Sequence, residues 1–121
     1  MRILVIEDAP SIRQMIGTLF AARGHDVDAV PTGAKGIDRA LVQCPDVVLL
    51  DLHLPGAFDG FDVCRKLRSA PATSAVPIVV ISAMTDDASK QRAADAGATA
   101  YYTKPFSPTA LLKEIESLRP R

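Results

Sequence analysis

The stretch Asp46-Val47-Val48-Leu49-Leu50-Asp51-Leu52-His53-Leu54-Pro55 leads an apolar run directly into a carboxylate, and a turn follows. A short, continuous apolar run bounded by turn signals is typical of a fully buried central strand. Asp51 is therefore expected where this strand leaves the core. A single aspartate after a strand is more often a loop cap than a functional group, so the rest of the chain decides between these interpretations.

The composition of the chain is that of an ordinary globular domain. It has 121 residues, of which 48% are hydrophobic and 23% are charged, and we expect one domain comprising residues 1–121. Lys plus Arg and Asp plus Glu are equal at 14 each. The bulk charge therefore indicates neither nucleic acid nor an anionic membrane as a partner, and any function based on charge must be local.

The two cysteines and the first residues indicate the cellular compartment. Cys44 and Cys64 are too few and too far apart for a disulfide framework or a zinc site. Both fall in expected helices, which favours buried free thiols in a reducing compartment. The apolar run at residues 3–6 is too short for a signal peptide or a membrane span. We therefore expect a cytoplasmic protein with no membrane partner.

Apolar runs alternate with helical patterns along the chain. The runs predict strands at residues 2–6, 27–30, 46–51, 76–81 and 98–103, and the periodic segments predict helices at about 10–23, 33–43, 60–68, 85–96 and 108–118. In the second helix Ile37, Leu41 and Val42 are expected to face inward, and in the third Arg68 is expected to face outward. Helix 85–96 has only alanines as apolar residues, so little of its surface can be buried apolar area.

Strands that are separated by helices pair in parallel through right-handed crossovers. The expected fold is therefore α/β, a doubly wound, flavodoxin-like, five-stranded parallel sheet with strand order 2-1-3-4-5 and helices on both faces. In such sheets the functional crevice lies beyond the carboxyl ends of the strands, between the first strand and the third.

Polar side chains follow four of the expected strands at this edge. They are Glu7 and Asp8 after the first strand, Asp51 at the end of the third, Ser82 at the end of the fourth and Lys104 after the fifth. Taken singly, the acids could cap a helix, the serine could be an ordinary strand-end hydroxyl and the lysine a solvated surface charge. Their complementary charges at one sheet edge favour a shared role.

Carboxylates crowded on neighbouring strand ends repel one another, and proteins relieve such crowding by protonation or by binding a cation. Oxygen ligands with open water positions suit Mg²⁺. Beside such an ion Asp51 is a carboxylate that could attack phosphorus, as in aspartyl-phosphate enzymes. Lys104 and the hydroxyl of Ser82 could then share the charge on the phosphoryl oxygens.

The sequence resembles the response-regulator receiver domains of two-component signalling over residues Arg2 to Leu118. The resemblance rests on ILVIED at 3–8, LLDLHLP at 49–55, DGFDVCRKLR at 59–68, VPIVVISA at 76–83 and GATAYYTKPF at 97–106. Each motif alone is weak, but together, in this order and spacing, they are highly specific.

The resemblance implies a phosphorylation-dependent signalling switch. Asp51 would accept a phosphoryl group from a histidine kinase or a histidine phosphotransfer protein. Asp8 and Asp51 would bind Mg²⁺ directly, Glu7 through a water molecule, and His53 through its backbone carbonyl and not its imidazole. The domain would catalyse only its own phosphorylation and dephosphorylation, so it would not be an enzyme acting on other substrates.

The remaining implied roles concern the switch itself. Ser82 fills the Ser/Thr switch position, Tyr101 the aromatic switch position and Lys104 the phosphate-binding position, and Lys104-Pro105 is expected to be a cis peptide. Phosphate on Asp51 would draw Ser82 toward it and let Tyr101 turn inward. The face formed by the fourth helix, the fifth strand and the fifth helix would then change shape for an unidentified downstream protein or output domain. Direct binding of nucleic acid is not expected.

The sequence departs from the family pattern in small ways. Glu7 stands where aspartate is commoner, and the loop at residues 56–58 has one residue more than the shortest family pattern. His53 and Met84 occupy positions that in this family influence the lifetime of the phosphoryl group.

Three alternatives remain open on the sequence. A nucleotide- or flavin-binding module of the same fold would cradle phosphate with glycine-rich loops and backbone N–H groups, whereas the loop here is Glu7-Asp8-Ala9-Pro10. A Mg²⁺-dependent phosphohydrolase would need an acid/base carboxylate two residues beyond its nucleophile, where His53 stands. A degenerate receiver that only binds partners would not need the complete set of site residues.

Overall fold

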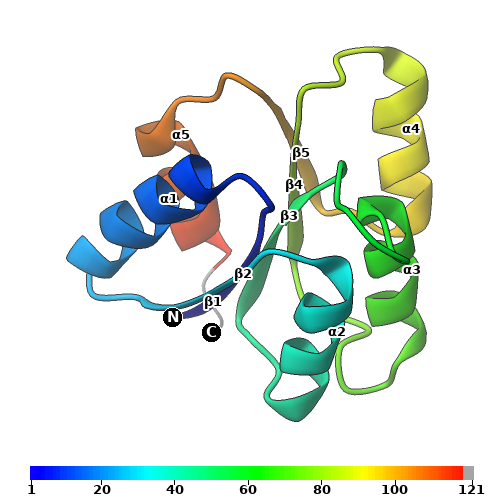
Figure 1. Cartoon of the computed structure of the whole chain (residues 1–121), viewed down its shortest axis with the longest axis horizontal. Helices are drawn as coiled ribbons and strands as arrows, with labels where there is room; N and C mark the ends of the chain where they lie inside the picture. The colour runs from blue at the N-terminus through cyan, green and yellow to red at the C-terminus, as the bar shows by residue number, and fades with distance from the viewer. Residues whose placement is uncertain (119–121) are drawn as a thin grey trace.

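The computed structural model describes residues 1–118, so residues 119–121 of the expected domain lie outside the described part of the chain. Helices and strands alternate as the apolar pattern predicts (Figure 1). The strands are β1 (Arg2–Ile6), β2 (Asp26–Val30), β3 (Val47–Asp51), β4 (Ile78–Ser82) and β5 (Ala100–Thr103). The helices are α1 (Pro10–Ala22), α2 (Gly33–Val42), α3 (Gly60–Ser69), α4 (Asp87–Ala96) and α5 (Pro108–Ser117). None of the helices within residues 1–118 has the length and apolar character needed to cross a membrane.

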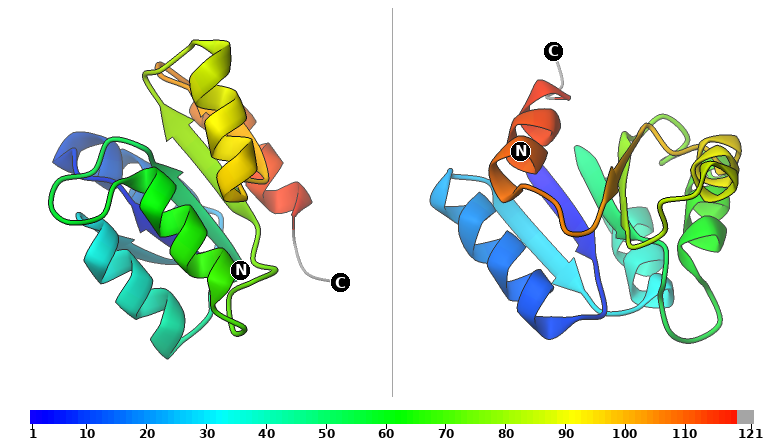
Figure 2. Two further views of the ribbon diagram at one scale, coloured as in Figure 1. Left: turned by 90° about the vertical axis from the view of Figure 1, so that its right-hand side faces the viewer. Right: turned by 90° about the horizontal axis from the view of Figure 1, so that it is seen from above.

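The strands form one parallel sheet in the order β2-β1-β3-β4-β5, which confirms the predicted topology. Helices α1 and α5 cover one face of this sheet, and α2, α3 and α4 cover the other (Figures 1 and 2). The chain moves from β1 outward to β2 and then returns to β3 on the opposite side of β1. The carboxyl ends of β1 and β3 therefore flank the crevice in which such folds bind their ligands.

Two apolar layers, one on each face of the sheet, hold the helices in place. Successive residues of a strand point to opposite faces. Leu4 and Ile6 of β1 accordingly pack in the layer beneath α2 and α3, whereas Ile3 and Val5 pack in the layer beneath α1 and α5. Every residue of β3 and β4 is buried. Polar side chains at the ends of these two strands therefore project directly from the core.

Helix α2 buries only part of the expected face. Ile37 is partly buried against the apolar layer, as predicted. Leu41 and Val42 are 49% and 86% exposed, so the prediction that they face inward is wrong. The buried residues of this helix are small, and Gly36 lies so close to Ile6 that a Cβ atom at this position would collide with that side chain. The close approach of α2 to the sheet leaves no room for large side chains on this face.

The cysteines also differ from one another. Cys64 is buried in α3, as expected, and burial raises the pKa of its thiol to about 11. Cys44 follows the end of α2 and is exposed, so the prediction of two buried thiols is half wrong. It lies beyond the last turn of the helix, where no apolar layer covers it.

Helix α4 buries little apolar area, and polar contacts hold its C-terminal end. Its buried residues are only Ala93 and Ala96, as the alanine-only pattern predicts. The end at Gly97 is held by Arg68 of α3, whose Nε donates a hydrogen bond of 2.9 Å to the Gly97 carbonyl. Another nitrogen of the same guanidinium group donates to the carbonyl of Val76. Arg68 is thus partly buried and not a solvated charge, because these loop carbonyls need a donor.

Candidate functional site

The five polar residues expected at one edge of the sheet lie at the carboxyl ends of its strands. Glu7 and Asp8 directly follow β1, Asp51 ends β3, Ser82 ends β4 and Lys104 directly follows β5. Asp51 pairs in register with Ile81, so Ser82 lies one residue beyond it on the adjacent strand. The doubly wound topology thus brings together residues that are up to 97 positions apart in the sequence.

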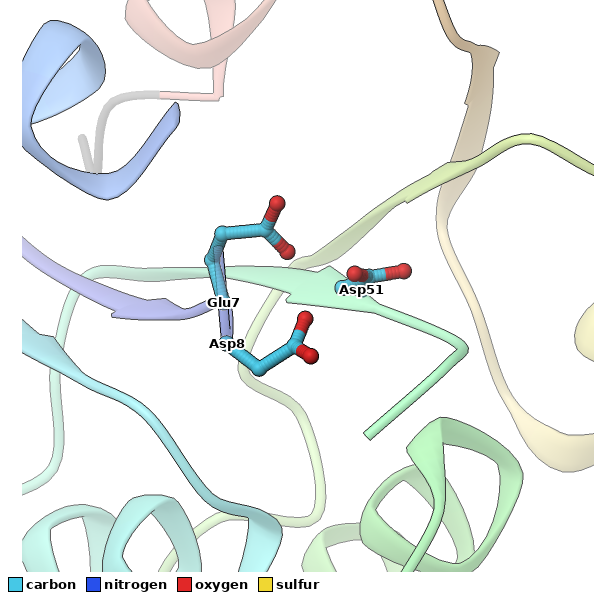
Figure 3. A group of neighbouring side chains, drawn as sticks. All are labelled: Glu7, Asp8 and Asp51. Atoms are coloured by element: carbon cyan, nitrogen blue, oxygen red, sulfur yellow. The ribbon is translucent and has the colours of Figure 1, made fainter. Parts of the chain in front are cut away.

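The three carboxylates form one compact group (Figure 3). Glu7, Asp8 and Asp51 each offer an oxygen, and these oxygens lie within 4.8 Å of one another. Glu7 and Asp51 are buried, whereas Asp8 is exposed and opens the group to solvent. The predicted acidic cluster is therefore present, with an open side through which a ligand can approach.

Lys104 links the two buried carboxylates. Its Nζ atom lies 2.9 Å from Oε1 of Glu7 and 3.1 Å from Oδ2 of Asp51. Burial alone would lower the pKa of Lys104, but its hydrogen bonds to Glu7 and Asp51 outweigh that effect and raise the pKa above its ordinary value. The lysine therefore stays an ammonium and offsets part of the negative charge of the group.

The surroundings of Glu7 disfavour its charged form despite the nearby ammonium. Its burial, followed by its interaction with Asp51, raises the pKa of Glu7 to about 8, although Lys104 acts in the opposite direction. Its Oε2 atom is buried and has no hydrogen-bond partner among residues 1–118. A buried carboxylate oxygen without a donor calls for a cation or an ordered water molecule.

The oxygen donors fit a hard divalent cation. Carboxylates that converge at a solvent-accessible opening are the ligands that Mg²⁺ takes in proteins, where it retains several water molecules. The unpartnered Oε2 of Glu7 and the exposed carboxylate of Asp8 are oxygen atoms of this kind. The residues present therefore fit Mg²⁺, with Glu7, Asp8 and Asp51 as the group that would hold it.

Both oxygens of Asp51 are held by donors. Oδ2 accepts from Lys104, and Oδ1 accepts a hydrogen bond of 3.1 Å from the backbone N–H of His53. His53 is an exposed residue. The hydrogen bond from its backbone N–H to Asp51 was not predicted from the sequence. The carboxylate is consequently fixed in orientation before any ligand arrives.

Ser82 and Tyr101 each form a hydrogen bond to the backbone of Met84, in the loop between β4 and α4. The Ser82 hydroxyl accepts a hydrogen bond of 3.0 Å from the N–H of Met84, and the Tyr101 hydroxyl donates one of 2.7 Å to the carbonyl of Met84. Ser82 is completely buried, and Tyr101 is partly buried against the layer beneath α4. The two residues expected to act in the switch are therefore connected through the backbone of one residue.

The peptide bond between Lys104 and Pro105 is cis, as the resemblance implies. Tyr102 points away from Tyr101 and packs in the layer beneath α1 and α5, as strand alternation predicts.

The position of Arg92 in the wall of the cleft beside the acidic group was not predicted from the sequence. This residue of α4 lines the same cleft as Asp8 and His53, and its Cζ atom lies 3.9 Å from the centroid of the Phe61 ring. An arginine in a polar helix gives no signal of such a position, since exposed arginine is the ordinary case.

A family model described as the response regulator receiver domain matches residues 3–116. The DNA-binding response regulator MtrA of Mycolicibacterium smegmatis is 39% identical over 116 residues, which are 96% of this chain and 49% of that protein. The chain thus spans about half the length of the curated relatives it matches.

Solved structures agree in fold over almost the whole chain. The chemotaxis response regulator CheY4 of Vibrio cholerae superposes with a TM-score of 0.90 at 28% identity and covers 97% of each chain. The receiver domain of the sensor histidine kinase PA1611 from Pseudomonas aeruginosa superposes with a TM-score of 0.88 at 27% identity, covering 97% of this chain and 95% of that one. The latter structure has a magnesium ion coordinated in its active site cleft.

Proposed function

This chain belongs to the response regulator receiver domain family, whose general function is a phosphorylation-dependent switch in two-component signalling, and from that premise we propose that Asp51 is its phosphoacceptor. The observation that carries the proposal is the position of this carboxylate. It ends the central strand inside the acidic group, and both of its oxygens are oriented by donors, Lys104 and the N–H of His53.

The proposed reaction uses the carboxylate directly. An oxygen of Asp51 attacks the phosphorus of a phosphohistidine on a partner protein, and an O–P bond forms. The P–N bond of the donor breaks, and the imidazole nitrogen keeps the electron pair. No general base is required, because a carboxylate is already ionised at neutral pH.

The remaining site residues would stabilise the transferred group. Members of this family bind Mg²⁺ in the active site, and here we assign the ion to Asp8 and Asp51 directly, to Glu7 through water and to the backbone carbonyl of His53. When bound, the ion would neutralise charge on the phosphoryl oxygens. Lys104 would leave its present carboxylate partners in part and pair with a phosphoryl oxygen.

We propose that Ser82 and Tyr101 transmit the change to the surface. If the Ser82 hydroxyl turns to a phosphoryl oxygen, it gives up the hydrogen bond from Met84. The loop carbonyl that holds the Tyr101 hydroxyl would then move, so the ring is free to turn inward. Helix α4 can follow at small cost because it buries little apolar area. The face formed by α4, β5 and α5 is the proposed output surface.

Partners and location follow from this role. We propose a histidine kinase or histidine phosphotransfer protein as the donor, an unidentified protein or output domain as the recipient, and a cytoplasmic location. The family acts as a signalling switch and not as a classical enzyme. We propose that this domain catalyses only its own phosphorylation and dephosphorylation. Direct binding of nucleic acid by the described residues is not proposed, since their function is assigned to the switch.

Treatment with a small phosphodonor and Mg²⁺, read by intact mass, tests the proposal. The wild type should gain one phosphoryl group and hold it, whereas Asp51→Asn should gain none. Asp38→Asn, which removes an exposed carboxylate of α2, should behave as the wild type. Phosphorylation of Asp51→Asn at the wild-type rate would refute the assignment, and rapid turnover of many phosphate esters would favour the hydrolase alternative.

A further inference from the structure

The carboxylates of Glu7 and Asp8 point toward the same place, although the two residues are adjacent in the sequence (Figure 3). Along an extended strand successive side chains point to opposite faces of the sheet, so neighbouring residues do not face one site. Here β1 ends at Ile6 and the backbone bends at Asp8, which brings both carboxylates beside Asp51. The geometry of the acidic group therefore depends on the shape of the loop at residues 7–9.

Arg13 of α1 donates hydrogen bonds to all three carbonyls of this loop. Its guanidinium Nη1 atom lies 2.8 Å from the carbonyl oxygen of Glu7 and 3.3 Å from that of Asp8. Its backbone N–H donates a hydrogen bond of 3.0 Å to the carbonyl of Ala9. The side chain is partly buried and does not extend freely into solvent. Arg13 thus holds the backbone on both sides of the bend.

Helix α1 begins without the side-chain cap that the other helices have. Its N-cap residue is Ala9, whose side chain cannot accept a hydrogen bond from the first turn. Pro10, which follows, has no N–H group. Helices α2, α3, α4 and α5 each begin with a side-chain cap, and these caps are Thr32, Asp59, Asp86 and Ser107, respectively. The loop before α1 therefore depends on Arg13 for an interaction that a cap supplies elsewhere.

The guanidinium group of Arg13 is not placed to neutralise the acidic group. It forms no ion pair with any residue from 1 to 118, and its hydrogen bonds go to backbone oxygens. As a positive charge alone, Arg13 would weaken the binding of a cation nearby. As a support for the loop, it would strengthen binding by keeping the carboxylates in place. The sign of its effect on metal affinity distinguishes these two roles.

We propose that Arg13 is a positioning residue for the divalent cation: through the carbonyls of Glu7 and Asp8 it fixes the bend that directs their carboxylates to the ion. The inference rests on the Mg²⁺ site of the proposed function. Replacing residues that orient metal ligands in this indirect way typically lowers metal affinity about 10- to 100-fold. We expect an effect at the lower end of this range, because losing the positive charge offsets part of the loss of support.

The test measures Mg²⁺ affinity without any phosphorylation. Urea denaturation is followed in EDTA and at increasing Mg²⁺ concentrations for the wild type, Arg13→Met, Arg13→Lys and Arg23→Met. The gain in stability of each protein over its own value in EDTA gives its dissociation constant for Mg²⁺. Arg23→Met is the matched control, because it removes the same side chain at the other end of α1, where Arg23 is exposed and pairs with Glu116.

We expect Arg13→Met to raise the dissociation constant for Mg²⁺ about tenfold and Arg23→Met to match the wild type. Arg13→Lys should raise it less, because an ammonium can still donate to a loop carbonyl. With a small phosphodonor, Arg13→Met should need about tenfold more Mg²⁺ to reach half of its maximal rate of phosphorylation. Its rate at saturating Mg²⁺ should stay close to that of the wild type, since Arg13 does not touch the reacting groups.

Three results would overturn the inference. Tighter binding of Mg²⁺ by Arg13→Met would show that the residue acts as a charge alone. Unchanged binding with lower stability in EDTA would show a purely structural role, and an equal loss of rate at every Mg²⁺ concentration would exclude an effect through the ion. If the wild type binds no Mg²⁺, the metal site of the proposed function fails together with this inference. Binding without phosphorylation would refute only the role of Asp51.

Discussion

The ammonium of Lys104 lies 3.1 Å from the carboxylate of Asp51, although 53 positions separate the two residues in the sequence. The same ammonium also contacts Glu7, so one cation from the end of β5 joins carboxylates from the ends of β1 and β3. This bridge is the electrostatic centre of the site, and its consequences for stability can be measured in the absence of metal.

Replacing Lys104 by methionine should expose the repulsion between Glu7 and Asp51. The lysine side chain is only 20% exposed, so its loss leaves two buried carboxylates with less compensation. We expect the free energy of unfolding at pH 8 in EDTA to fall by about 1–3 kcal/mol. Urea denaturation measures this difference. Lys113→Met, which removes an exposed lysine of α5, is the control, and equal losses in the two variants would contradict the expectation.

Replacing Glu7 by glutamine should stabilise the metal-free protein in a way that depends on pH. The pKa of Glu7 is raised from 4.5 to about 8, so the folded state disfavours its ionised form. The native protein consequently loses stability as the pH rises from about 4.5 toward 8, and Glu7→Gln removes this loss. We expect a gain of at least about 1 kcal/mol at pH 8, since one pKa unit corresponds to about 1.4 kcal/mol.

Below pH 4.5 the wild type and Glu7→Gln should be equally stable, because the carboxyl group of Glu7 is then protonated in both the folded and the unfolded state. Thermal or urea denaturation in EDTA across this range measures the effect. Glu114→Gln on α5, outside the site, serves as the matched control. A gain of the same size at every pH would show that burial of the Glu7 charge is not its cause.

Replacing Tyr101 by phenylalanine should loosen the loop between β4 and α4. The substitution removes the hydroxyl that donates to the carbonyl of Met84 and keeps the ring. We expect the free energy of unfolding to fall by about 0.5–1.5 kcal/mol, the usual effect of removing one hydrogen bond. Hydrogen exchange should become faster in residues 83–96 and stay unchanged in β1. Tyr102→Phe, on the opposite face of β5, should not accelerate exchange in this segment.

Replacing Arg68 by alanine should free the C-terminal end of α4. Its guanidinium group donates to the carbonyls of Val76 and Gly97, and these would be left without a donor. We expect the free energy of unfolding to fall by about 2–3 kcal/mol. Hydrogen exchange near residues 94–99 should also accelerate. Arg65→Ala loses one exposed ion pair with Asp62 and should cost less than about 1 kcal/mol; a similar cost for both would contradict the role of Arg68.

Some residues of the site owe their position to local sequence pattern and to sheet topology, and these could be predicted from the sequence. The apolar runs before Glu7 and Asp51 mark buried strands, and alternation with helices makes the strands parallel. Parallel strands present their carboxyl ends at one edge, so these two acids and Lys104 had to meet there. The cis peptide before Pro105 came from the family resemblance and not from any pattern in the residues.

Other features depend on distances between elements that no local pattern encodes. Leu41 and Val42 fit an apolar helical face, but the close contact of Gly36 with Ile6 turns the side of α2 that carries Gly36 and Ile37 toward the sheet and leaves Leu41 and Val42 exposed. Arg92 likewise reaches the cleft only because α4 packs beside α3 and Phe61 lies beneath it.

The sequence alone thus determined the alternation of parallel strands with helices and the convergence of the acidic group, because periodicity along a strand or helix records which residues meet the core. Only the tertiary structure decided which helix faces are covered, which carbonyls Arg68 binds and where Arg92 projects. These outcomes depend on how closely separate elements approach, and that distance is set by the side chains of both partners at once.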